Sequence, residues 1–285
     1  MIKKILKLSL VGKTNAGKST FINNIVGETV SIQNKKINTT QELIIGVKNL
    51  HNSQFIFYDT PGLSNLKSLD KNKKKLKTNL WEGINQSDII LFIIDSKNFK
   101  ITYIHEQLIK LLELDKKIII IFNKVDLISK KILLPIIKEL NNKYNIEAFF
   151  VISAKLKYGI ENLMKFLKKY AKDSKWIFHK NVISNKDDIF ISNECTRNSI
   201  LTFLHKEIPY NIKIKNIIFK YLKNGDLKIK QKIIIDQNRY KKIILGKKGE
   251  KIKSIREYSQ KEIEKIFKVN THLYLEIIEV NAKKN

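Results

Sequence analysis

The stretch from Leu6 to Ser19, which reads LKLSLVGKTNAGKS, decides the fold of this 285-residue chain. Its first half is an apolar run typical of a buried strand, and its second half is a glycine-rich loop that opens a helical pattern at Lys18. A loop in this position presents backbone N–H groups to phosphate oxygens at the N-terminus of a helix. The stretch therefore predicts a nucleotide site at the end of the first strand of an α/β domain.

Further apolar runs follow, each ending in a polar motif, and helical patterns separate them. The runs cover residues 54–58, 89–95, 117–123 and 148–153. This alternation predicts a doubly wound, mostly parallel sheet, in which ligands bind at the carboxyl ends of the strands. A last helical pattern over 161–170 closes the domain, so we expect it to span residues 1–172, with a linker over 173–190.

The remaining chain has a different order of elements. We expect a helix over 192–206, two strands over 212–221 and 227–235, a short helix, a glycine-rich turn, a long helix and a strand over 273–280. The dipeptide Asn224-Gly225 between the first two strands is a hairpin signal. This order predicts a second, smaller α+β domain over residues 191–285.

The tetrapeptide Asn123-Lys124-Val125-Asp126 predicts which base the nucleotide carries. An aspartate at the end of this motif can accept two hydrogen bonds from the N1 and N2 hydrogens of guanine, a pattern that adenine lacks. A site built around such a carboxylate rejects the wrong base because the carboxylate would stay unpaired. Backbone N–H groups of Ser153-Ala154-Lys155 can meet the guanine carbonyl.

Hydroxyl and carboxylate groups near the phosphate loop predict a magnesium site. Lys18 should bridge the β- and γ-phosphates, Ser19 should ligate Mg²⁺, and Asp59 in Asp59-Thr60-Pro61-Gly62 should hold the ion through a water. Thr40 would complete the metal shell when a γ-phosphate is present, and the alternative is that Thr39-Thr40 belongs to a solvated loop. Loss of the Thr40 contact on hydrolysis would release the segment as a switch.

The loop Gly246-Lys247-Lys248-Gly249 is the informative motif of the second domain. Two glycines without side chains let a nucleic-acid backbone approach closely, and the lysines between them can meet phosphates. Residues 239–256 hold eight basic side chains and one acidic one, Glu250. The apolar residues expected to line a groove for bases are Ile243, Ile244, Leu245, Ile252 and Ile255. The expected RNA-binding residues are Gly246, Lys247, Lys248, Gly249, Lys251, Ile252 and Lys253.

The composition sets broad limits on function. The net charge of +28 is spread evenly, since residues 1–174 carry 30 basic and 15 acidic side chains and residues 175–285 carry 25 and 12. Local clustering is therefore the better guide to a nucleic-acid surface. The single cysteine, Cys195, predicts a buried helix residue, and no apolar run approaches the ~20 residues of a membrane span. We expect a cytoplasmic protein.

In their order and spacing these motifs resemble the translation-factor class of GTPases over residues 1–172, and together with the second domain they resemble the Era family. The resemblance implies a P-loop GTPase domain and a type II KH domain that binds the 3′ end of 16S ribosomal RNA during assembly of the 30S subunit. It implies Mg²⁺ as cofactor, peripheral membrane association and a monomer. The GTP-binding residues it implies are Gly12, Lys13, Thr14, Asn15, Ala16, Gly17, Lys18, Ser19, Thr20, Asp59, Thr60, Pro61, Gly62, Leu63, Asn123, Lys124, Val125, Asp126, Ser153, Ala154 and Lys155.

Some residues depart from related patterns. Leu63 stands where small signalling GTPases carry a glutamine that orients water, so intrinsic hydrolysis should be slow. We assign no single catalytic residue and expect hydrolysis around Asn15, Lys18, Thr40 and Gly62. By resemblance, Asn15 would coordinate an activating K⁺. Two further departures are Gln41, in place of the family's switch arginine, and the short C-terminus. The alternative function is a GTP-dependent switch that recruits a protein or membrane partner.

Overall fold

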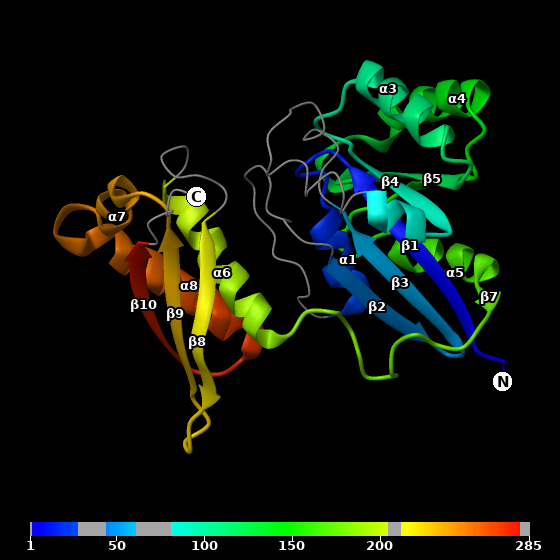
Figure 1. Ribbon diagram of the computed structural model, residues 1–285. Coiled ribbons are helices and arrows are strands. Elements are labelled where there is room, and N and C mark those ends of the chain that lie inside the picture. The colour runs from blue at the N-terminus through cyan, green and yellow to red at the C-terminus, as the bar shows by residue number, and fades with distance from the viewer. Residues whose placement is uncertain (1, 28–43, 61–80, 205–211, 280–285) are drawn as a thin grey trace, which may run out of the picture. The chain divides into compact units, whose positions relative to one another are not determined.

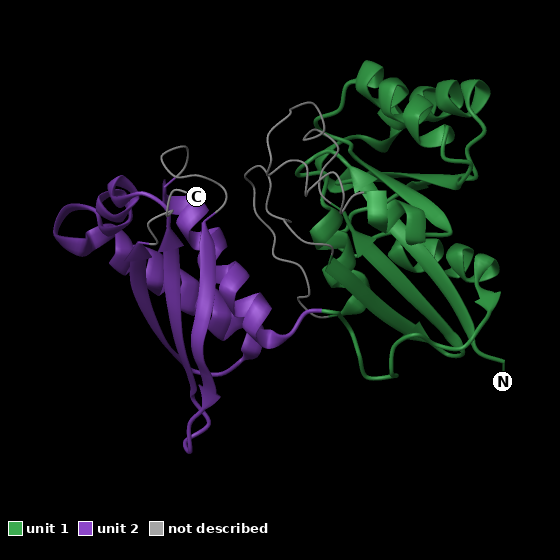
Figure 2. Ribbon diagram, in the orientation of Figure 1, with its two compact units in different colours: residues 1–185 green, residues 186–285 purple. Residues whose placement is uncertain are grey.

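The computed structural model describes residues 2–27, 44–60, 81–204 and 212–279. It divides into two compact units, residues 1–185 and residues 186–285, shown in different colours in Figure 2. The first unit is an α/β domain and the second is α+β, as the patterns predict.

A seven-stranded sheet forms the centre of the first unit. Six strands follow the order β2-β3-β1-β4-β5-β6, and β7 pairs with β1. The strands β1, β3, β4, β5 and β6 run parallel to their neighbours, whereas β2 is antiparallel to β3 and β7 is antiparallel to β1 (Figure 1). Their bounds are β1 (Lys4–Gly12), β2 (Ile44–Leu50), β3 (Ser53–Asp59), β4 (Ile89–Asp95), β5 (Lys117–Asn123), β6 (Ala148–Val151) and β7 (Lys172–Asp173).

Both faces of this sheet are buried, which explains the continuous apolar runs 55–58 in β3, 89–94 in β4 and 118–122 in β5. On one face α1 (Lys18–Val26) and α5 (Ile160–Leu167) pack against residues such as Leu8, Phe57 and Ile121. On the other face α3 (Ile101–Leu112) and α4 (Leu133–Lys143) pack against Phe92 and Ile120. The sheet is thereby held rigid, and the ends of its strands are fixed in position.

Residues 174–185 lie with the first unit, whereas the sequence pattern predicts a linker over 173–190. The buried side chain of Gln54 in β3 accepts hydrogen bonds from the Ile177 and Phe178 N–H groups and donates one to the Phe178 carbonyl. The Ile183 carbonyl accepts a hydrogen bond from the Val47 N–H of the edge strand β2, at 2.8 Å. These contacts attach the segment to the sheet.

The second unit has a three-stranded sheet of order β10-β9-β8, in which β9 pairs antiparallel with β8 and parallel with β10. Its helices pack on one face of the sheet, and the core includes Ile200, Ile233, Ile244 and Ile255 (Figure 1). The element bounds are α6 (Asp188–Leu204), β8 (Lys213–Tyr221), β9 (Leu227–Ile235), α7 (Asn238–Leu245), α8 (Glu250–Phe267) and β10 (Thr271–Glu279).

The expected element order of the second unit is confirmed, from its first helix to its last strand. Cys195 is buried in α6 as predicted, and burial raises the pKa of its thiol. In the part of the chain that the structure describes, no helix has the length and apolarity that crossing a membrane requires.

Candidate GTP site and RNA-binding loop

The phosphate loop connects β1 to α1 and depends on glycine at two close approaches. A Cβ atom on Gly12 would lie 2.3 Å from the carbonyl oxygen of Ile93 in β4. Gly17, which caps α1 with φ 94°, leaves no room either, since a Cβ there would lie 2.3 Å from Nδ2 of Asn123. The loop is thus pressed against the neighbouring strands, and its backbone N–H groups can surround a phosphate.

Lys18 lies at the start of α1 with its side chain buried. Its ammonium group donates hydrogen bonds to the Gly12 and Lys13 carbonyls, both at 3.2 Å. Burial lowers the pKa of Lys18, and the nearby Asp59 carboxylate acts in the opposite direction. The protein therefore holds a poorly solvated cation beside the loop, which a phosphate would stabilise.

Ser19 and Asp59, the two described residues of the predicted magnesium site, lie in contact with each other. The Ser19 hydroxyl donates to Oδ2 of Asp59 at 3.0 Å, and Asp59 is fully buried at the end of β3. The donor set of one hydroxyl and one carboxylate, beside a phosphate loop, suits Mg²⁺, a hard cation that prefers oxygen ligands. The next residue, Thr60, is buried and donates to the Leu10 carbonyl, so its side chain supports β1.

Asn123 joins the phosphate loop to the predicted base-recognition loop. Its Nδ2 donates to the Ala16 carbonyl at 2.9 Å, and its Oδ1 accepts from the Ala154 N–H at 2.9 Å. The residue is 2% exposed. Because these groups have no access to water, losing one bond would leave a buried partner unsatisfied. Asn123 therefore fixes the distance between the site for phosphates and the site for the base.

Lys124 makes a second connection to the phosphate loop. It lies in the left-handed region with φ 65°, and its ammonium group donates to the Asn15 carbonyl at 2.6 Å and to Oδ2 of Asp95 at 2.7 Å. Asp95 is not among the site residues that the sequence motifs predict. Its position at the end of β4, at the same sheet edge as Asp59 and Asn123, is a signal that could have identified it.

Asp126 is solvent-exposed in a 3-10 turn, Val125–Leu127. Its carboxylate is accessible to a ligand. In the neighbouring tripeptide, Ser153 N–H bonds to the Tyr158 carbonyl and Ala154 N–H bonds to Asn123. The Lys155 N–H has no acceptor among the described residues, so of the three it is the group available to a base.

Several predicted site residues lie outside the described residues. They are Thr39, Thr40, Gln41, Pro61, Gly62 and Leu63. The described part of the chain contains no cluster of three histidine, cysteine or acidic residues that could hold a metal ion.

The loop Gly246 to Gly249 lies between α7 and α8, as predicted. Both glycines have positive φ, 68° and 80°, and a Cβ on Gly246 would lie 2.6 Å from Cγ of Lys251. Lys248 also has a positive φ of 50°, a conformation that costs a non-glycine residue about 1–2 kcal/mol. Lys247, Lys248, Lys251 and Lys253 are all exposed. The loop thus presents exposed lysines on a strained backbone, and the end of α7 and the start of α8 constrain it.

The predicted groove residues divide into two sets. Ile244 and Ile255 are fully buried in the core of the second unit, so they cannot contact a base. Ile243, Leu245 and Ile252 are only partly buried and remain accessible beside the loop. Helical periodicity explains the division, because residues on the inner side of each helix face the sheet.

Comparison with protein families agrees with this geometry. A family model described as 50S ribosome-binding GTPase matches residues 7–124, and a KH domain model matches residues 207–285. The chain is 35% identical over 281 residues to GTPase Era of Rickettsia prowazekii (strain Madrid E), covering 99% of this chain and 94% of the relative. It is 38% identical over 279 residues to GTPase Era of Buchnera aphidicola subsp. Acyrthosiphon pisum (strain APS), covering 95% and 96%.

Solved structures give the same picture. The chain matches a crystal structure of Era in complex with MgGDPNP and nucleotides 1506–1542 of 16S ribosomal RNA, with a TM-score of 0.84 and 31% identity, over 98% of this chain and 95% of that one. It also matches a variant of Aquifex aeolicus Era bound to GDP·AlF4⁻, with a TM-score of 0.84, 30% identity and the same coverage.

Proposed function

The chain belongs to the Era family of GTPases, and from that membership we propose that it is a GTP-hydrolysing switch that binds 16S ribosomal RNA near its 3′ end through its KH domain and acts in assembly of the 30S subunit. The first unit supplies the nucleotide switch, and the second unit supplies the RNA-binding site.

The observation that carries the nucleotide half is the position of Asn123 between two loops. It bonds to Ala16 in the phosphate loop and to Ala154 in the loop after β6. A ligand that fills the site must therefore carry phosphates at one end and a base at a fixed distance. Asp126 and the Lys155 N–H supply the acceptor and the donor that guanine requires.

Residues near the phosphates fit the expected magnesium ion. Ser19 and Asp59 would hold it, and the ion would offset the charge that develops on the phosphates during hydrolysis. Lys18 would bind the same phosphates from the other side. Because Leu63 cannot orient water, we propose slow intrinsic hydrolysis, with K⁺ bound near Asn15 as an activator. Hydrolysis rates in potassium and in sodium test the K⁺ proposal, and equal rates would end it.

The RNA half is supported by the strained, lysine-bearing loop Gly246 to Gly249. Residues held in unfavourable backbone conformations concentrate at binding sites. Lys247 and Lys248 are exposed there. A phosphate backbone could lie against the two glycines, while Ile243 and Ile252 offer apolar contact to bases.

The decisive experiment replaces both loop lysines by aspartate, as K247D/K248D, and measures binding of single-stranded RNA from the 3′ end of 16S ribosomal RNA. The matched control is K261D/K265D, which reverses two exposed charges on α8 in the same unit. We expect the loop variant to bind far more weakly and with a salt slope reduced by about 1.4, since each lost phosphate contact removes about 0.7. Equal binding by the two variants would refute the KH assignment and favour a protein or membrane partner.

Three properties implied by the family resemblance remain proposals. They are a cytoplasmic location, peripheral association with a membrane surface and a monomeric state. Sedimentation of the purified chain with and without GDP tests the last of these, and flotation with anionic vesicles tests the second.

A further inference from the structure

The face of the second sheet opposite its helices is rich in lysine. In β9 burial alternates strictly, with Leu227, Ile229, Gln231, Ile233 and Ile235 turned toward the helices. The residues between them point to the other side, which no described helix of this unit covers (Figure 1). The register places six lysines there, and we call them the lysine face: Lys213, Lys215 and Lys220 of β8 and Lys228, Lys230 and Lys232 of β9.

Cross-strand pairing puts like charges directly opposite each other on this face. Lys215 pairs with Lys232, and Lys220 pairs with Lys228. Such pairs destabilise a sheet because the positive charges repel. Only one of the six lysines has an ion pair with a described residue: Lys230 lies 3.5 Å from Glu276 of β10. The fold thus retains positive charge that its own residues do not neutralise.

This charge is a property of the face rather than of the composition. The helix α8 has five basic and four acidic residues, and α6 has one basic and two acidic residues, whereas α7 beside the loop has three basic residues and no acidic one. The lysine face has six basic residues, and its acidic neighbours among the described residues are Glu276, beside Lys230, and Asp226, at its end. A chain with a uniform lysine bias would not leave α6 and α8 near neutrality. The face therefore has the electrostatic character of a surface for a polyanion.

An aromatic ring lies beside these charges. Tyr274 of β10 is the cross-strand partner of Lys230, is 53% exposed, and has the Lys228 ammonium group 5.7 Å from its ring centroid. An accessible ring on a sheet, surrounded by lysines, is the arrangement on which unpaired bases stack while phosphates meet the charges. A duplex would hide its bases from such a ring.

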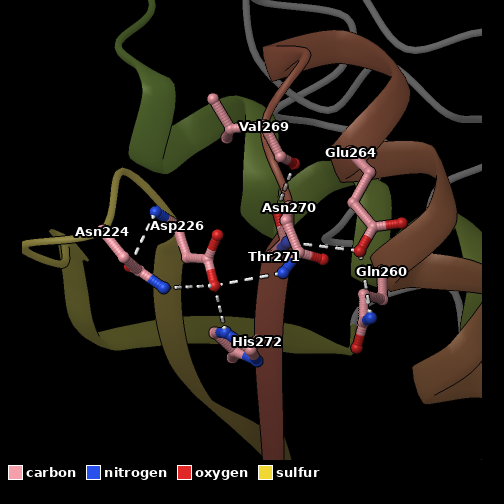
Figure 3. A network of polar contacts seen from close by, with 8 residues as sticks. All are labelled: Asn224, Asp226, Gln260, Glu264, Val269, Asn270, Thr271 and His272. Carbon is pink, nitrogen blue, oxygen red and sulfur yellow. Dashed lines mark hydrogen bonds and ion pairs between the residues drawn. The ribbon is translucent and has the colours of Figure 1, made fainter.

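A polar cluster fixes the end of this face. Asp226 accepts hydrogen bonds from His272 at 2.8 Å, from Asn224 at 2.9 Å and from Asn270 at 3.1 Å, which joins the β8–β9 turn to the start of β10 (Figure 3). His272 pairs with Lys228 across the strands. The cluster holds β10 in register, so that Tyr274 stays beside Lys230.

We propose that the lysine face and Tyr274 form a second RNA surface, which binds single-stranded RNA that extends beyond the loop Gly246 to Gly249. The inference rests on the proposed function of the second unit. From Lys228 to Ile234 the face is about 20 Å long, enough for a few nucleotides. The helix α7, which ends at this loop, packs on the other face of the same sheet against β9 and β10, so RNA that leaves the loop has to pass an edge of the sheet to reach the lysine face.

The test measures binding of two RNAs to the full chain loaded with Mg²⁺ and a non-hydrolysable GTP analogue. A KH groove clamps about four nucleotides, so an RNA of about 6 nucleotides fills the groove alone, while an unstructured RNA of about 20 nucleotides can also reach the lysine face. The variant is K228Q/K232Q, and the matched control is K261Q/K265Q, which removes two charges at the same spacing from α8.

We expect K228Q/K232Q to weaken binding of the long RNA by about tenfold or more in 0.1 M salt and to reduce its salt slope by about 1.4, with binding of the short RNA unchanged. The same variant should raise the melting temperature, because it removes both like-charge pairs. A merely structural role for the lysines would not weaken RNA binding while stabilising the fold. Tyr274→Ala should weaken binding of the long RNA about fivefold, and Tyr274→Phe should bind this RNA like wild type.

Other outcomes would overturn the proposal. If wild type binds both RNAs and the two double variants bind the long RNA equally, the lysine face has no role while the proposed function stands. If wild type binds neither RNA, the proposed function fails and this inference fails with it. If K228Q/K232Q loses only its binding to vesicles of phosphatidylethanolamine and phosphatidylglycerol, the face is a membrane surface.

Discussion

Gly17 in the phosphate loop lies so close to Asn123 that a Cβ atom on the glycine would be 2.3 Å from Nδ2 of the asparagine. The same Nδ2 donates to Ala16, and the other side-chain atom, Oδ1, accepts from Ala154. A methyl group at position 17 would displace Asn123 and break both bonds. The phosphate loop and the base-recognition loops are therefore coupled through one side chain.

This coupling predicts different effects for two glycines with the same backbone conformation. Gly17 and Gly27 both have φ 94°, but a Cβ on Gly27 would have nothing within 4 Å. We expect Gly27→Ala to cost about 1–2 kcal/mol of stability and to leave GDP binding unchanged. Gly17→Ala should in addition weaken GDP binding by about 100-fold, since two buried hydrogen bonds are lost. Titration with fluorescent GDP measures the affinity of each variant, and equal affinities would disprove the coupling.

Asp95 should prove to be a positioning residue for the nucleotide site. It holds the Lys124 ammonium group that also bonds to the Asn15 carbonyl. Asp95→Asn removes the charge from a partly buried pair, which should cost about 1 kcal/mol and weaken GDP binding about fivefold. The control is Glu161→Gln, which breaks the exposed pair with Lys165 and should leave binding unchanged. An unaltered GDP affinity in the Asp95 variant would show that Lys124 needs no partner.

Lys18 should lower the stability of the nucleotide-free protein. Burial lowers its pKa, so the folded state holds the ammonium less favourably than the unfolded state does. The resulting penalty is present below the folded pKa and fades as the pH rises through it. We expect Lys18→Met to raise the melting temperature without nucleotide and to weaken GDP binding at least about tenfold, because a charged contact with phosphate is lost. A lower melting temperature without nucleotide would contradict the argument.

We expect replacement of Gly249 to weaken RNA binding and to affect stability only through backbone strain. A Cβ on Gly249 or on Gly225 would have nothing within 4 Å, and both residues have positive φ. Alanine at either position should therefore cost similar stability. If RNA lies against the loop, Gly249→Ala alone weakens binding of a short single-stranded RNA. Equal RNA affinities of the two variants would place the RNA elsewhere.

The nucleotide-site motifs could be predicted from the sequence because each one follows a strand, and strands with two buried faces are nearly uniform apolar runs. Long-range contacts could not be predicted in this way. Residues 174–185 have no periodicity of their own, and they are attached by the side chain of Gln54, more than a hundred positions away. The strand β2, which that segment borders, was also not predicted.

In the second unit, too, the contacts between elements could not be predicted from the sequence. Its element order follows from alternation and periodicity, yet Ile244 and Ile255 were expected in the groove and lie in the core. A helix has one buried side, and the side that faces the sheet depends on how the helix packs in three dimensions. The pairing of Lys215 with Lys232 depends likewise on strand register, which a bulge between Asn216 and Ile218 shifts by one residue.

The cluster around Asp226 predicts how the second unit responds to acid. The hydrogen bond from His272, followed by those from Asn224 and Asn270, lowers the pKa of Asp226 below its usual range. A carboxylate with a lowered pKa contributes stability above its unfolded pKa of about 3.9, and the contribution is lost as the pH falls through the folded value. We expect Asp226→Asn to increase hydrogen exchange in β10 at pH 7 and to match wild type at a pH below both values. The control, Asp236→Asn, removes an exposed charge from the same unit and should leave exchange in β10 unchanged. A difference between Asp226→Asn and wild type that persists undiminished at low pH would show that the carboxylate charge is not what holds the strand.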